Sequence, residues 1–409
     1  MSFGIALSGL NAAQTDLNVT ANNIANSATN GFKQSRSEFA ELFAVSPQGV
    51  SRNAYGNGVK VAAVAQQFSQ GNINTTNSSL DLALSGQGFF TLSDGGARAY
   101  SRAGAFQVDN SGYVVNSQNQ RLQVYPPATT GNFNTSTMGD LRLVTSESAP
   151  QATSEVETVF NLPANSTQPA SATFDPADPN SFNEARSVTI YDSLGAAHTA
   201  SLYWTKTATP NQWSMNVYVD GNAVGGSQTL QYSSTGVLTT PANGQIALPQ
   251  YDAAAGLATG AAPIQMTFDL SRSTQFGDAF SMTSSTQDGF TTGRLIGIDV
   301  DSSGVVQARF TNGRSTSLGQ VAIANFSNPQ GLQQLGNTNW SETNASGQPL
   351  FGQAGGSGFG LVQSGALEAS NVDITAQLVN MITAQRNFQA NAQMIQTADQ
   401  VTQTIINIR

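Results

Sequence analysis

Three short segments of this chain contain residue types that could do chemistry. Asp299, Asp301 and Gly304 match the opening of a calcium-binding loop, in which carboxylates alternate along a tight turn. The fifth position of such a loop is Ser303, however, and the twelfth is Phe310, where a bidentate glutamate is needed. The segment therefore predicts a hairpin turn and no metal site.

The second segment surrounds His198, the single histidine, which has Asp192 and Ser193 nearby in the sequence. No nucleophile elbow surrounds Ser193, so a structural histidine is favoured over a hydrolase triad. The third segment contains four glycines, Gly355, Gly356, Gly358 and Gly360. Their spacing matches neither the dinucleotide-binding motif nor the P-loop motif, which predicts a loop before the C-terminal helix. No catalytic, cofactor-binding or metal-binding residue is predicted, and we expect no enzyme.

Composition excludes several classes of partner. Only 10% of the 409 residues are charged, and the formal net charge is −9 without a cluster of Lys or Arg. Nucleic acids and anionic membranes both require basic arrays, so neither is expected as a partner. No run approaches the ~18 apolar residues that span a bilayer. Because cysteine is absent, disulfides and thiolate sites are excluded. The N-terminal segment has no Lys or Arg before Lys33 and does not resemble a cleaved signal peptide.

The clearest spacing lies at the two ends, where apolar residues recur at steps of three and four and so lie on one helical face. A stripe this narrow needs a partner to bury it, which favours a subunit that packs against copies of itself. Gln14 interrupts the N-terminal stripe. The C-terminal stripe keeps its spacing to Ile395 and continues in its last part after a shift of one residue. The predicted assembly residues are Phe3, Leu7, Leu10, Leu17 and Ile24, followed by Leu378, Met381, Phe388, Ile395, Val401 and Ile405.

Local signals mark where these helices begin and end. Asn30-Gly31 predicts the end of the first helix, and Ser370-Asn371-Val372-Asp373 predicts a capping box before the second. The asparagines of the first helix are weak helix formers, which favours ordering on assembly. The alternative is that the two helices pair inside one ordinary globular monomer.

The residues between the helices alternate between apolar and polar, which predicts β-structure. Leu80, Leu82 and Leu84 open one such run, and turn signals such as Asp94-Gly95 separate the predicted strands into an antiparallel meander. Composition changes between about 146 and 285, which predicts a separate β-domain. A third run contains a hairpin whose turn is Asp301-Ser302-Ser303-Gly304.

The terminal segments also resemble a known family. Ser8-Gly9-Leu10-Asn11 and the stretch from Asn22 to Lys33 are similar to the N-terminal signature of the bacterial flagellar rod, hook and hook-associated axial proteins. Gly365 to Asp373 and Gln385-Arg386-Asn387-Phe388 resemble the matching C-terminal signature. Between them, Tyr100 to Phe106 and Leu318 to Phe326 are similar to the β-domain of this family.

The resemblance implies a multidomain α+β fold with a nested order. An inner coiled-coil-like helical domain would comprise 1–32 and 361–409, and 33–76 would form a connecting arm. A mainly antiparallel middle β-domain would comprise 77–145 and 286–360. An outer β-domain, 146–285, would be inserted in it. The family's rod proteins are shorter and lack such an insert.

The resemblance also implies the function. The chain would be a structural subunit of the curved, flexible, hollow tube that transmits torque from rod to filament. Its partners would be itself, the distal rod protein, a cap protein, the hook-associated junction protein and the type III export apparatus. It would act outside the cell in the flagellum, exported without cleavage. The alternatives are a distal rod or junction protein, an extracellular β-rich adhesin or, less well supported, a glycan hydrolase.

Overall fold

The computed structural model describes residues 2–42, 56–128, 132–143, 147–171, 173–252 and 260–407. The chain forms two compact units. The first contains 1–144, 297–309 and 315–409, and the second contains 145–296 and 310–314. Arg409 and residues 43–55, which are part of the predicted arm 33–76, lie outside the described residues.

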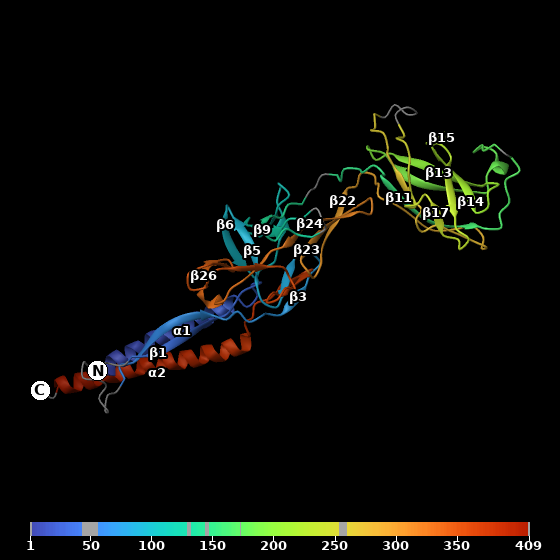
Figure 1. The fold of residues 1–409 in the computed structure, drawn as a ribbon. Helices are drawn as coiled ribbons and strands as arrows, with labels where there is room; N and C mark the ends of the chain where they lie inside the picture. The colour runs from blue at the N-terminus through green and yellow to red at the C-terminus, as the bar shows by residue number, and fades with distance from the viewer. Residues whose placement is uncertain are drawn as a thin grey trace. The chain divides into compact units, whose positions relative to one another are not determined.

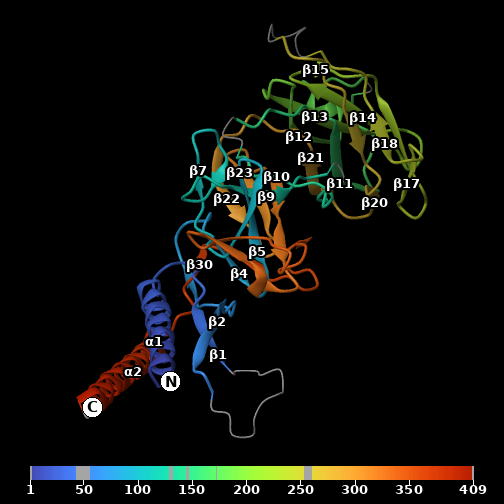
Figure 2. The same cartoon turned by 90° about the vertical axis from the view of Figure 1, so that its left-hand side faces the viewer.

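Two terminal helices belong to the first unit and lie side by side (Figures 1 and 2). They are α1, Ser2–Ala25, and α2, Ile374–Asn407. The pair is antiparallel, because Asn23 near the end of α1 hydrogen-bonds Gln377 near the start of α2. At the other end of the pair, Phe3 shares a groove with Val401. Both predicted helices are therefore present, and within one chain they pack on each other.

The predicted helix boundaries need correction. The first helix ends at Ala25, before the predicted Asn30-Gly31 stop, and the turns that follow lead to Gly31 with φ of 70°. The second helix begins at Ile374, so the predicted capping box is wrong in its position. Asp373 itself is the cap and accepts hydrogen bonds from the N–H groups of Thr375 and Ala376. The Ser370 hydroxyl instead accepts from Val372 N in the preceding turn.

A β-hairpin follows α1 and lies along it (Figure 1). Its strands are antiparallel, and Ser35 pairs with Gln66. The predicted arm thus contains regular structure on both sides of the undescribed segment. The strands are β1, Ser35–Glu41, and β2, Val59–Gln66.

A 13-stranded sheet is built mainly in the first unit, with the central order β22-β23-β24-β9-β5-β6-β27-β26. Its core contains Leu84, Phe90, Leu122 and Ile323, all fully buried. The predicted antiparallel pairing is confirmed for β5 with β6 and for β9 with β5. The structure also pairs β9 with β24, which joins the first run of strands to the third. The strands are β5 Phe89–Asp94, β6 Ala97–Ser101, β7 Gln107–Val108, β8 Val114–Val115, β9 Arg121–Tyr125, β10 Gly139–Asp140, β22 Leu295–Val300, β23 Val305–Phe310, β24 Ser315–Val321, β25 Ile323–Asn325, β26 Gln333–Gly336, β27 Asn339–Ser341 and β28 Leu350–Gly352.

Two short ladders pair segments that precede the strands of this sheet in the sequence with segments that follow them. They are antiparallel pairs of β3, Ile73–Thr75, with β30, Ala366–Glu368, and of β4, Leu82–Ser85, with β29, Leu361–Ser364. The chain just before α2 is therefore anchored in β-structure.

The second unit packs a five-stranded sheet and a six-stranded sheet around one core, which includes Phe160, Trp204, Trp213 and Phe268. Its pairing is not wholly antiparallel, because β11 pairs in parallel with β19 and β20. Short 3-10 helices span Pro179–Ser181 here and Pro329–Gly331 in the first unit. The strands are β11 Glu155–Pro163, β12 Glu184–Tyr191, β13 Ala197–Lys206, β14 Gln212–Val219, β15 Asn222–Ala223, β16 Gln228–Tyr232, β17 Leu238–Thr240, β18 Gln245–Ala247, β19 Thr267–Asp269, β20 Thr274–Phe276 and β21 Ser281–Gln287.

Candidate assembly interface

The most buried face of α1 consists of small side chains. Ala6, Ala13 and Thr20 recur every seven residues and are 1%, 7% and 3% exposed. The distance between packed helices depends on the side chains at the contact, so small residues allow a close approach. This face holds α1 against the rest of its own chain.

The large apolar residues predicted on α1 lie elsewhere on the helix. Leu10, Leu17 and Ile24 are partly buried, whereas Phe3 is 50% and Leu7 42% exposed. A large share of the predicted stripe is therefore not covered by the chain's own packing.

The second helix likewise buries small or polar side chains and leaves its large apolar side chains partly or half exposed. Met381, Phe388 and Ile395 are partly buried, and the buried residues among the described side chains of this helix are again small or polar, Ala384 and Gln377. Leu378 and Val401 remain 46% and 58% exposed. The side chain of Ile405 lies outside the described part of the chain. Whether these residues contact neighbouring copies stays a prediction.

Ser8 and Gly9 fix α1 on two sides. Gly9 faces α2 so closely that a Cβ there would lie 2.5 Å from Oδ1 of Asn391. On the other side, the Ser8 hydroxyl accepts a hydrogen bond of 3.1 Å from Val59 N at the start of β2. A larger residue at position 9 would have to displace the Asn391 side chain, and a residue without a hydroxyl at position 8 would lose the hydrogen bond to β2.

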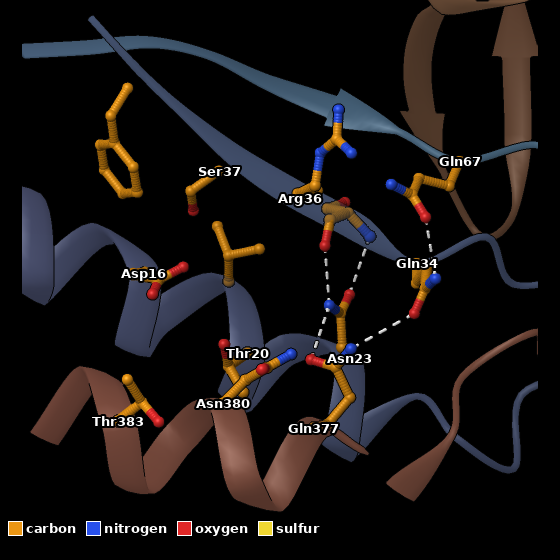
Figure 3. Close-up of a pocket in the computed structure, with 13 residues that line it drawn as sticks. Asp16, Thr20, Asn23, Gln34, Arg36, Ser37, Gln67, Gln377, Asn380 and Thr383 are labelled. Carbon is orange, nitrogen blue, oxygen red and sulfur yellow. Dashed lines mark hydrogen bonds between the residues drawn. The ribbon is translucent and has the colours of Figure 1, made fainter.

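A chain of side-chain amides joins both helices to the hairpin (Figure 3). Asn23 donates to Ser35 O at 2.8 Å, accepts from Ser35 N at 2.9 Å and donates to Gln377 Oε1 at 3.3 Å. Gln377 donates in turn to Gln34, and Gln34 donates to Gln67. Asn23, a weak helix former in sequence terms, thus forms tertiary hydrogen bonds at the helix end.

A buried ionic cluster, which we call the Glu368 cluster, lies where the terminal segments enter the β-structure. It comprises Glu368, Lys33 and Arg102. The Lys33 Nζ lies 2.6 Å from Oε1 of Glu368, and the Arg102 Nη1 lies 3.2 Å from Oε2. The side chains of Lys33 and Glu368 are 0% exposed. Gly71 N also donates to Oε1, while Ser69 O accepts from Lys33 and Gly86 O accepts from Arg102.

Burial dominates the electrostatics of this cluster. Desolvation lowers the pKa of the Lys33 ammonium from its ordinary value, although the Glu368 carboxylate opposes the shift. Desolvation lowers the pKa of Arg102 in the same way. One carboxylate therefore offsets two buried cations, and losing it would leave both without a counter-charge.

Sequence reasoning missed the Glu368 cluster. A signal was present, because each of its three residues lies inside one of the family-like motifs of a chain that is only 10% charged. What the sequence lacked was the pairing, since Lys33 and Glu368 are 335 residues apart.

The chemical candidates from the sequence have structural roles. Asp301 Oδ1 accepts hydrogen bonds from Ser303 N and Val305 N, so the predicted hairpin turn is confirmed. His198 is 4% exposed on β13, and its Nδ1 lies 2.6 Å from Asp220 Oδ2. The Ser193 hydroxyl instead accepts from Ala262 N.

The described residues contain neither a metal-binding cluster nor a membrane-spanning helix. No group of three or more His, Asp or Glu side chains there could hold a metal ion. No helix in the described ranges has the length and apolar character needed to cross a bilayer.

Terminal helices that leave apolar surface open, combined with β-units, fit a structural subunit that packs against other subunits. Four family models match the chain. They are the flagella basal body rod protein model at 3–33, the flagellar hook protein FlgE/F/G D1 domain at 83–168, the flagellar basal body protein FlaE D2 domain at 161–290, and the flagellar basal body rod FlgEFG protein C-terminal model at 363–408.

Full-length relatives identify the branch of the family. The chain is 38% identical to the flagellar hook proteins FlgE of Salmonella typhimurium and of Escherichia coli, with 100% of each chain covered. It is 33% identical to FlgE of Borreliella burgdorferi, covering 98% of both chains. The chain belongs to the flagellar hook protein family, whose members are structural subunits of the hook.

A solved structure agrees at the level of the fold. The crystal structure of Helicobacter pylori flagellar hook protein FlgE2 superposes with a TM-score of 0.53 at 13% identity, covering 72% of this chain and 100% of that one.

Proposed function

We propose that this chain polymerises through its terminal helices into the flagellar hook, a curved, flexible, hollow tube that transmits motor torque from the rod to the filament. The observation that carries the proposal is the helix pair. It fills its inner face with small and amide side chains and leaves large apolar residues such as Phe3, Leu378 and Val401 about half exposed. Burying such side chains in neighbouring copies is worth ~1.5–3 kcal/mol for each complete burial.

The domain order that we propose is nested. The helices, with 1–32 and 361–409, form the inner domain, and 33–76 connect it to a middle domain of 77–145 and 286–360. The outer domain, 146–285, is inserted in the middle domain. This order is supported by the composition of the second compact unit from two segments that interrupt the first.

Torque transmission round a bend requires each subunit to change length once per turn without detaching. We assign this compliance to small motions between the two compact units. The backbone passes from one unit to the other at four positions, 144/145, 296/297, 309/310 and 314/315. This small number of connections supports the assignment.

The remaining parts of the proposal concern assembly in the cell. The subunit travels through the flagellar type III apparatus with its N-terminus intact and adds beneath a cap protein. The finished tube joins the distal rod protein to the hook-associated junction protein, outside the cell. The absence of cysteine supports passage of an unfolded chain that cannot crosslink.

The test replaces Leu17 with Asp. This charge enters the predicted contact stripe, so we expect polymers to be lost from sedimentation and electron microscopy. Asn22→Asp is the matched control, because Asn22 is exposed on the same helix but lies off the stripe, and its variant should polymerise. The three tryptophans, Trp204, Trp213 and Trp340, all lie in β-strands, so their fluorescence checks that the β-units stay folded. Normal tubes from Leu17→Asp would refute the proposal.

A further inference from the structure

Four positions in the described part of the chain join an asparagine to a glycine. At such a pair the backbone N–H of the glycine can attack the side-chain amide of the asparagine, because a residue without a Cβ leaves that approach open. Asparagine is accordingly among the heat-labile residues of proteins. The four pairs are Asn30-Gly31, Asn57-Gly58, Asn243-Gly244 and Asn312-Gly313.

The fold restrains the attacking nitrogen at three of the pairs. In each of them the glycine N–H donates a backbone hydrogen bond, and this bond must break before the nitrogen can attack. Folding therefore slows the reaction at these pairs. The bonds run from Gly31 N to Glu368 O at 2.8 Å, from Gly244 N to Pro241 O at 2.9 Å, and from Gly313 N to Phe310 O at 3.1 Å.

The asparagine side chain is also held at two of these three pairs. Asn312 Nδ2 donates to Thr291 O at 2.8 Å, and Asn312 Oδ1 accepts from Arg314 N at 3.1 Å. Asn243 Oδ1 accepts from Gln245 N at 3.2 Å. A side-chain amide fixed in this way cannot turn its Cγ toward the next backbone nitrogen without losing these bonds.

The pair Asn57-Gly58, just before β2, lacks both restraints. The Asn57 side chain is exposed, and in the ranges that the structure describes neither its side-chain amide nor Gly58 N has a hydrogen-bond partner. The backbone around it is nevertheless paired, because Asn57 N donates to Leu42 O at 2.7 Å and Leu42 N donates to Gly58 O at 2.8 Å. Both reacting groups are therefore free at this pair.

We propose that Asn57 is a modification site, at which the folded chain converts spontaneously to aspartate and isoaspartate. Gly58 N forms a bond to Cγ of Asn57 while the Cγ–Nδ2 bond breaks, and ammonia leaves with the proton of the N–H group. Water then opens the resulting succinimide ring. Breaking the bond between Gly58 N and Cγ gives aspartate, whereas breaking the bond between Gly58 N and the main-chain carbonyl carbon gives isoaspartate.

The isoaspartate product alters the end of the hairpin that contacts α1. Its main chain passes through the side chain and is longer by one methylene group, so the two hydrogen bonds to Leu42 lose their register. The next residue is Val59, whose N–H donates to the Ser8 hydroxyl of α1. Modification at Asn57 therefore adds a negative charge and weakens the attachment of α1 to β2.

The experiment follows all four pairs by peptide mass spectrometry in the full chain, incubated in mildly alkaline buffer. Replacing the amide by an acid raises the peptide mass, whereas isomerisation of an existing aspartate does not. In the folded chain the Asn57 peptide should convert about tenfold faster than the other three, the factor that one lost hydrogen bond supplies. In concentrated urea the four peptides should convert at similar rates, because the protecting hydrogen bonds are gone.

Two substitutions sharpen the assignment. Asn57→Gln should abolish the early mass gain of the folded chain, because the longer side chain does not form the five-membered ring. Asn243→Gln is the matched control and should leave the early mass gain unchanged. Both side chains are exposed, so neither substitution should unfold the chain. An isoaspartate-specific methyltransferase should label the Asn57 peptide of the wild-type chain and not that of Asn57→Gln.

Three results would overturn the inference. Equal rates at the four pairs of the folded chain would show that the hydrogen bonds protect none of them. Faster conversion at any of the other three pairs would assign the site elsewhere. An Asn57 that stays an amide in the folded chain, although it converts in urea, would show that the fold protects it as well. None of these measurements involves polymerisation, so the inference is tested separately from the proposed function.

Discussion

At the residue scale, Glu368 is the point where the terminal segments and the β-structure meet. Its carboxylate binds Lys33 from the segment after α1, Gly71 N from the segment after the hairpin, and Arg102 from the end of β6. Because the Glu368 cluster is buried, its geometry depends on all of these segments being in place. It is a structural anchor for the helices.

Replacing Glu368 with Gln tests this role. The amide keeps the shape but leaves two buried cations without a counter-charge, so the free energy of unfolding of the first unit should fall by about 3–5 kcal/mol. Urea denaturation, with hydrogen exchange at residues 31–33 and 366–369, measures the loss. Glu38→Gln breaks an exposed ion pair with Arg36 and should change stability by less than about 1 kcal/mol. Equal effects of the two substitutions would contradict the anchor.

Asp288 gives a second prediction at this scale. Partial burial raises the pKa of its carboxyl, but hydrogen bonds from Glu155 N, the Ser154 hydroxyl and Ser154 N outweigh burial, and the pKa lies below its ordinary value of 3.8. The unfolded chain therefore binds the proton more readily than the folded chain. The stabilisation is complete above pH 3.8 and is lost as the pH falls through the lower folded pKa.

Thermal unfolding of the second unit between pH 5 and strong acid should show this loss, and Asp288→Asn should reduce it. The comparison is internal, because Asn keeps an acceptor oxygen but cannot titrate. Parallel acid profiles of the two proteins would exclude Asp288 as a source of the pH dependence.

At the scale of elements, the helices depend on their ends more than on propensity. The first turn of α2 has two N–H groups satisfied by Asp373, and the helix continues without interruption through the predicted one-residue shift in its apolar pattern. At the matching end of α1, the amide chain through Asn23 and Gln377 supplies tertiary hydrogen bonds. Short polar contacts thus set the register of the helix pair.

Asp373→Ala should cost about 1 kcal/mol, because the first helical N–H groups lose their acceptor. Hydrogen exchange should show faster opening of residues 374–378. Ser370→Ala is the control, since its hydroxyl serves only Val372 N in the turn before the helix. If Ser370→Ala frayed the helix as much as Asp373→Ala, the capping role of Asp373 would be wrong.

At the scale of the whole molecule, the inner helical domain cannot be separated at the predicted boundary of 361 without loss. Residues 361–368 include β29 and β30, which pair with β4 and β3, and they include Glu368 itself. The physical boundary of the β-structure therefore lies just before Asp373. On the C-terminal side, the chain is purely helical only after that point.

Two fragments test this boundary. A fragment of 33–372 keeps both ladders and the Glu368 cluster, so it should fold and stay monomeric where the full chain polymerises. A fragment of 33–360 loses Glu368 and the partners of β3 and β4, so its first unit should unfold at lower urea concentration. The fluorescence of Trp204 and Trp213 in the second unit should be the same in both. Polymers of 33–372 would show that the terminal helices are dispensable for assembly.

The sequence alone determined the features that depend on neighbouring residues in the chain. Steps of three and four predicted helices at both ends, and alternation with turn residues predicted hairpins such as that at Asp301 to Gly304. Family-like motifs predicted the assembly class. These signals are local, so they survive without knowledge of the fold.

Only the tertiary structure decided which side chains each element buries. It placed Ala6, Ala13 and Thr20 inside and left Phe3 and Leu7 about half exposed, although all five share one helix. It also joined Lys33 to Glu368 across 335 residues and Asn23 to Gln377 across 354. Periodicity defines a face but not its partner, because the partner comes from distant segments whose approach depends on packing, burial and satisfied hydrogen bonds.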